Sequence, residues 1–111
     1  MQRACERIHA RRSTFSADVR LLVAQGPSDV PVSSPIVREL DAALRERDER
    51  VAVDGMSAWT DAALFNEAGI PAVCFGPGDI SLAHAAEEYI PLDEIDRATA
   101  VLATLAGRWC A

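Results

Sequence analysis

Lysine is absent from the 111 residues, and all eleven basic side chains are arginine. No apolar run approaches the roughly 20 residues that cross a bilayer, so we expect no membrane partner. The N-terminal region has no apolar stretch of the kind found in a secretory signal, so we expect none. Three widely spaced cysteines make neither a disulfide framework nor a Cys-x-x-Cys metal motif. These absences together favour a cytoplasmic protein with reduced thiols.

The charge is acidic overall and unevenly distributed. The net charge of -6 argues against nucleic acid as a partner, because phosphate binding needs a basic surface. Residues 1–20 carry five arginines and two acids, a balance of +3, whereas the remaining residues carry six arginines and fifteen acids, a balance of -9. We interpret the basic end as a solvated helix face, with a contact surface as the alternative.

Apolar periodicity predicts helices and strands in a mixed order. Helical spacing is found over residues 2–11, 35–48, 61–68 and from Asp93 to the end. Ser34 before Pro35 is typical of a helix start, and Gly69 of a helix end. We expect Asp93 to cap the final helix. Alternation over 15–23, and apolar runs at 51–53 and 72–75, predict strands. The expected fold is therefore α/β, with a sheet flanked by helices.

His84 stands out among the residues that could carry chemistry. It follows the predicted strand at 72–75 and a Gly76-Pro77-Gly78 turn, on a loop that also holds Glu88. Loops at the carboxyl ends of such strands often carry functional sites. A neutral imidazole there can bind a transition metal or serve as a structural hydrogen-bonding group, and spacing alone leaves both open.

The neighbouring motifs are less specific. The Gly76-Pro77-Gly78 sequence makes a tight turn, and it lacks the Lys-Ser/Thr and G-x-G-x-x-G patterns of phosphate loops. Thr60 can cap the helix that follows, and Asp61 is either an acid of the first turn or a site residue. No G-x-S-x-G motif supports nucleophilic catalysis, and Cys74 lies within an apolar run.

Four elements in order give the chain a resemblance to a known family. They are Trp59-Thr60-Asp61-Ala62, Ala68-Gly69-Ile70-Pro71-Ala72-Val73, Phe75-Gly76-Pro77-Gly78, and Ala83-His84 with Glu88-Tyr89-Ile90-Pro91. Together they resemble the C-terminal part of the M20 family of zinc-dependent peptidases and deacylases. That family includes acetylornithine deacetylase, succinyl-diaminopimelate desuccinylase and the carboxypeptidase G type. The resemblance is close over residues 55–95 and agrees in outline elsewhere.

The resemblance implies roles for several residues. His84 matches the last ligand of a two-zinc site, and cobalt or manganese would also suit a single histidine. The resemblance makes Thr60, Asp61, Gly76, Pro77, Gly78 and Glu88 residues that line or shape the site. It implies that residues 1–24 are the last helix and strand of an α+β lid domain of the dimerisation type. It also implies that 25–34 form a linker and that 35–111 close a zinc-peptidase-like catalytic domain. The implied partners are a small N-acyl amino acid or peptide substrate and a second copy bound through the lid.

Motifs that the family carries earlier in its chain are missing here. The sequence has no His-x-Asp, and its Glu87-Glu88 pair follows the final histidine instead of preceding it. One imidazole cannot hold a catalytic zinc, which needs about three protein ligands. We therefore expect a fragment of an amide-bond hydrolase, with no catalytic base of its own and no activity in isolation. The alternative is a non-catalytic binding or dimerisation module with the same origin.

Overall fold

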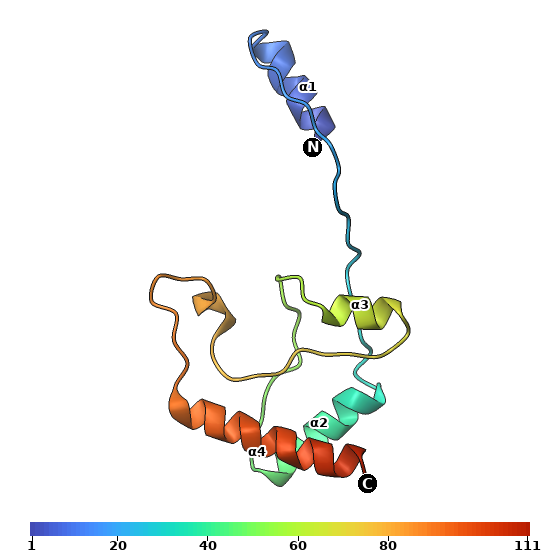
Figure 1. The fold of residues 1–111 in the computed structure, drawn as a ribbon, viewed down its shortest axis with the longest axis vertical. Coiled ribbons are helices and arrows are strands. Elements are labelled where there is room, and N and C mark those ends of the chain that lie inside the picture. The colour runs from blue at the N-terminus through green and yellow to red at the C-terminus, as the bar shows by residue number, and fades with distance from the viewer.

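The computed structural model describes residues 1–111 and contains helices but no β-strand (Figure 1). In chain order the elements are α1 (Gln2–Arg11), α2 (Pro35–Glu46), α3 (Ala62–Glu67), the 3₁₀ turn η1 (Ile80–Leu82) and α4 (Leu92–Trp109). All four predicted helices are therefore present. Helices α2 and α4 are the one pair of elements that packs together, and coil segments make up the rest of the chain.

The core lies where α2 and α4 cross. The four buried residues of the chain all belong to these two helices, and they are Ala43, Leu44, Ala98 and Val101. Partly buried Leu40, Phe75 and Leu105 pack against three of them, Ala43, Leu44 and Val101. Phe75 comes from the coil between α3 and η1, so this coil is held to the helix pair by an apolar side chain. Burial of apolar side chains is the main stabilising contribution in such a small core.

Charged side chains border the same helix pair. Arg108 of α4 lies 2.9 Å from Glu39 and 3.6 Å from Glu46, both of α2. Arg47, at the end of α2, donates a hydrogen bond of 2.9 Å to Thr104 of α4. Because these groups are exposed, each pair contributes less than about 1 kcal/mol. They orient one helix on the other, while the apolar contact supplies most of the stability.

The helix ends agree only in part with the predicted capping. Helix α2 has Ser34 at its N-cap and Pro35 at its first position, as predicted. Helix α4 has Pro91 as its N-cap, so the prediction that Asp93 caps it is wrong. Asp93 instead lies in the first turn, where a carboxylate interacts favourably with the helix dipole. Helix α3 has Asp61 as its N-cap in place of the predicted Thr60.

Helix α3 ends in the predicted way at Gly69. This glycine has a φ of 78°, in the left-handed region, and its N–H donates to the carbonyl of Asn66 at 3.0 Å. The N–H of Ile70 donates to the carbonyl of Phe65 at 2.8 Å. These two bonds are those of a Schellman motif, which pairs carbonyl groups that the helix leaves without a partner.

The predicted α/β fold is wrong, because no part of the chain forms a sheet. Segments 15–23, 51–53 and 72–75, predicted as strands, are coil without any backbone ladder. A strand exists only when a neighbouring strand accepts and donates its backbone hydrogen bonds. Alternating or continuous apolar residues indicate which side chains favour burial, but they do not supply that neighbour. The sheet flanked by helices and the lid strand are therefore both absent.

The N-terminal segment stands apart from the α2–α4 pair. Helix α1 and the coil that follows it extend away from the rest, as Figure 1 shows at its upper end. The radius of gyration is 20.2 Å, whereas a compact domain of this length has about 13 Å. Within this segment, His9 Nδ1 and the carbonyl of Phe15 lie 2.6 Å apart, which folds the coil back along α1. None of the helices is both long and apolar enough to span a membrane.

The burial pattern of α4 leads to a prediction. Val101 is 1% exposed and its neighbour Leu102 is 45% exposed. Val101→Ala removes buried methyl groups and leaves a cavity, so it should lower the free energy of unfolding by about 2 kcal/mol. The control Leu102→Ala should lower it by less than about 0.5 kcal/mol. Urea unfolding followed by circular dichroism measures both, and equal losses would contradict the α2–α4 core.

Candidate functional site

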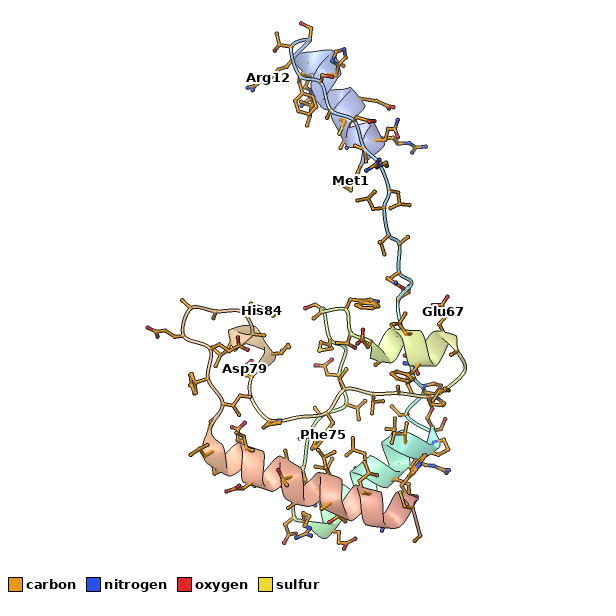
Figure 2. The ribbon with its side chains drawn as sticks, in the orientation of Figure 1. Met1, Arg12, Glu67, Phe75, Asp79 and His84 are labelled. Atoms are coloured by element: carbon orange, nitrogen blue, oxygen red, sulfur yellow. The ribbon has the colours of Figure 1, made fainter.

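The predicted site residues divide between two parts of the chain. His84 and Glu88 lie in the loop that leaves Gly76-Pro77-Gly78, passes through η1 and reaches α4, and Figure 2 labels His84 near the end of η1. Thr60 and Asp61 lie at the start of α3. No hydrogen bond or ion pair joins Thr60 or Asp61 to the His84 loop. Five of the seven predicted residues therefore lie in one stretch of the chain, and the other two lie at α3. The five are Gly76, Pro77, Gly78, His84 and Glu88.

His84 is exposed and has an unusual backbone conformation. Its φ of 65° lies in the left-handed region, which residues with a Cβ seldom adopt. The N–H of His84 donates to the Glu88 carboxylate at 3.0 Å. The two residues thus meet through a backbone amide, and the interaction does not involve the imidazole ring.

The glycine turn is tied to α4. The N–H of Gly78 donates to Glu94 Oε2 at 2.8 Å, and Glu94 lies in the first turn of α4. Gly78 has a φ of 90°, which a glycine adopts without strain. A Cβ at this position would lie 3.1 Å from Ile90 Cγ1, so the side chain of Ile90 lies against the glycine. Sequence reasoning did not identify Glu94, because an acid in a first turn is common for helix-dipole reasons alone.

Asp79 holds the start of the same loop. Its Oδ1 accepts from the N–H of Ser81 at 2.8 Å, which caps η1. The backbone and side chain of Ser81 both hydrogen-bond this carboxyl and lower the pKa of Asp79 below its usual value. The ionised form is therefore the one that closes the turn, and it is lost as the pH falls through that lowered pKa.

A second residue that sequence reasoning missed positions the segment before the turn. The side-chain amide of Asn66 in α3 accepts from the N–H of Ala72 at 2.7 Å and donates to the carbonyl of Ala72 at 2.9 Å. It also donates to Ser28 Oγ at 2.6 Å. Asn66 thus pairs with Ala72 as a neighbouring strand would. It is the only asparagine in the sequence, and that was the one signal available.

Thr60 is joined to the same segment. Its hydroxyl lies 3.2 Å from Cys74 Sγ, and all three cysteines are free thiols. Beyond Cys74, a hollow of about 270 Å³ lies between the glycine turn and the α2–α4 pair. Phe75, the Gly76-Pro77-Gly78 turn, Arg50, Glu94 and Arg97 are among the residues that line it. The glycine turn is therefore one wall of a small open cleft, with α4 as another.

The residues present do not fit a complete metal site. No group of three or more His, Cys, Asp or Glu side chains is arranged to hold an ion. A zinc site takes about four ligands, three of them from the protein at a catalytic centre. Glu88, the acid that contacts His84, accepts the His84 N–H through its Oε2. The chain alone thus provides at most one imidazole for the two-zinc centre that the resemblance implies.

Comparisons with known proteins agree with the motif analysis. The model of "Peptidase family M20/M25/M40" matches residues 7–108, which is nearly the whole chain. The chain belongs to this family. No solved structure matches it.

Several curated proteins are similar to this M20 family chain. It is 34% identical over 96 residues to an acetylornithine deacetylase of Myxococcus xanthus, covering 86% of the chain and 24% of that protein. It is 38% identical over 78 residues to an N-acetyl-L-citrulline deacetylase of Xanthomonas campestris, which covers 66% of the chain and 21% of that protein. It is 38% identical over 63 residues to a succinyl-diaminopimelate desuccinylase of Corynebacterium glutamicum, which covers 57% of the chain and 16% of that protein. The chain spans at most about a quarter of the length of these M20 relatives.

Gly78 allows a direct test of the turn geometry. Gly78→Ala places a Cβ at positive φ and 3.1 Å from Ile90, so it should destabilise the folded chain by about 1–2 kcal/mol. The control Gly76→Ala adds a Cβ that meets nothing within 4 Å. Thermal unfolding measures the pair, and a Gly78→Ala variant as stable as the control would argue against this turn.

Asn66 allows a test of the substitute strand contact. Asn66→Ala should speed hydrogen exchange at the Ala72 amide by roughly tenfold, because the amide loses its acceptor. Asn66→Asp keeps an acceptor oxygen for that amide and should preserve most of its protection. Glu67→Ala, at the next and exposed position, is the neutral control. Unchanged exchange in Asn66→Ala would show that the contact does not hold the segment.

Proposed function

We propose that this chain is the part of an M20 hydrolase that supplies the final metal-ligating histidine for cleavage of an amide bond. The observation that carries the proposal is the family match over residues 7–108, which includes the whole His84 loop. The named relatives are two deacetylases and a desuccinylase, so the proposed substrates are N-acyl amino acids or small peptides. His84 would contribute one imidazole nitrogen to a site of two zinc ions, with cobalt or manganese as alternatives.

The surroundings of His84 support this role. The side chain is exposed and no hydrogen bond occupies the ring, so its nitrogens are free to bind. Glu88, Thr60, Asp61 and the glycine turn would shape the pocket around it. Since the chain has no group of three metal donors, the remaining ligands and the general base would come from other residues of the enzyme. In isolation the chain should therefore hydrolyse neither substrate class.

The proposal extends to the organisation of the whole protein. Residues 1–24 would end a lid domain through which two copies associate, 25–34 would be a linker, and 35–111 would belong to the catalytic part. The separation of α1 from the α2–α4 pair is consistent with that division. Three free thiols are consistent with a cytoplasmic location.

One observation favours a second candidate. Only four residues are buried, whereas large apolar side chains such as Leu21, Leu22 and Val53 are more than two-thirds exposed. Exposed apolar surface on this scale is typical of a binding surface. The chain would then be a non-catalytic binding or dimerisation module, and His84 would have no metal to hold.

A chimeric enzyme that carries this segment distinguishes the two candidate functions. Residues 7–108 would replace the matching segment of the Myxococcus xanthus acetylornithine deacetylase. The first proposal expects the chimera to hydrolyse N-acetylornithine. In it, His84→Ala should lower kcat/KM by roughly 100-fold or more and reduce the bound metal measured by mass spectrometry.

His9→Ala is the matched control, because His9 is the only other histidine and lies in α1. It should leave rate and metal content unchanged. A folded chimera whose activity and metal content survive His84→Ala would overturn the ligand role and favour the binding module.

A further inference from the structure

The loop that carries His84 is closed at its two ends. The side chain of Ile90 lies against Gly78, since a Cβ there would be 3.1 Å from Ile90 Cγ1. The bond from Gly78 N–H to Glu94 joins the start of the loop to the helix that follows its end. Compact loops of roughly 6–16 residues with adjacent ends are Ω-loops, which pack on their own side chains. Residues 78–90 have this length and adjacent ends.

Hydrogen bonds inside the loop order the backbone that leads to His84. Asp79 accepts from Ser81 N–H through its side chain, and from Leu82 N–H through its carbonyl at 3.0 Å. The N–H of Ala85 donates to the carbonyl of Leu82, also at 3.0 Å. These turns bring the chain to His84 in a set direction. The last of these bonds closes a type II β-turn over residues 82–85, in which Ala83 has a φ of -60° and a ψ of 128°. His84 is the third residue of this turn, a position that requires a positive φ.

Two residues other than glycine have positive φ, and each lies where a hydrogen-bonded turn requires it. Asp48 has a φ of 55° just after α2, where Glu49 N–H donates to the carbonyl of Leu44 at 2.9 Å. That bond belongs to a Schellman end, which requires a left-handed residue. His84 takes the third position of the type II turn, which glycine usually occupies, and its N–H donates to the Glu88 carboxylate. A hydrogen bond to a charged acceptor offsets backbone strain of this size.

We propose that Glu88 is a positioning residue, which stabilises His84 at the left-handed position of the type II turn and so sets the direction of the imidazole. Glu94 performs the same task for the base of the loop through Gly78. The role of the imidazole rests on the proposed function, but the backbone contact does not. Glu88 acts through its bond to the main chain, so the site is arranged before any metal or substrate binds.

Nuclear magnetic resonance of the isotopically labelled full chain tests this role without metal. In Glu88→Ala the amide proton of His84 should move upfield and exchange about tenfold faster, because its charged acceptor is gone. Glu88→Gln keeps an acceptor oxygen and should restore part of both effects. Glu87→Ala removes the adjacent acid, which makes no contact with the His84 amide, and should change neither. An unaltered His84 amide in Glu88→Ala would overturn the proposal.

The deacetylase chimera separates this proposal from the function itself. Glu88→Ala should lower kcat/KM by about 10- to 100-fold, with partial rescue by Glu88→Gln. If Glu88→Ala speeds exchange of the His84 amide while His84→Ala leaves activity intact, the proposed function fails and the positioning role stands. If His84→Ala abolishes activity while Glu88→Ala leaves the shift and exchange rate of the His84 amide unchanged, the positioning role fails and the function stands.

Discussion

The apolar contact between α2 and α4 is the interaction on which the rest of the structure depends. All of the buried residues belong to these two helices, and the coil segments have no core of their own. Phe75 reaches this contact from the coil before the glycine turn, and Glu94 reaches the turn from α4. The candidate site is thus attached to the helix pair at two points, one apolar and one polar.

The parts of the fold that sequence analysis predicted are those that depend on local chemistry. Helix propensity, the Ser34-Pro35 start and the left-handed Gly69 are properties of a few neighbouring residues, and the structure confirms them. The strands at 15–23, 51–53 and 72–75 depend on a distant partner, and here the prediction was wrong. Asn66 shows the difference clearly, because it supplies to Ala72 the two hydrogen bonds that a neighbouring strand would otherwise make.

The candidate site divides in the same way. Motif order drew attention to the His84 loop and the glycine turn and gave the resemblance to the M20 family, and the family match confirms that resemblance. The contacts that shape the loop were beyond prediction, because Glu88 and Glu94 act through backbone amides that any residue possesses. Only coordinates show which carboxylate a given amide contacts. Spacing placed Glu88 four residues after His84, but it did not indicate that the main chain would be its partner.

Helix α4 contacts the glycine turn at one end and α2 at the other. Its first turn holds the base of the His84 loop through Glu94, and its last turn contacts Glu39 of α2 through Arg108. An α-helix of 18 residues is a stiff rod about 27 Å long. Rotation or sliding of α4 on α2 would therefore move Gly78 with it and change the orientation of the loop. Helix packing at one end of α4 would thus change the position of the histidine near the other end.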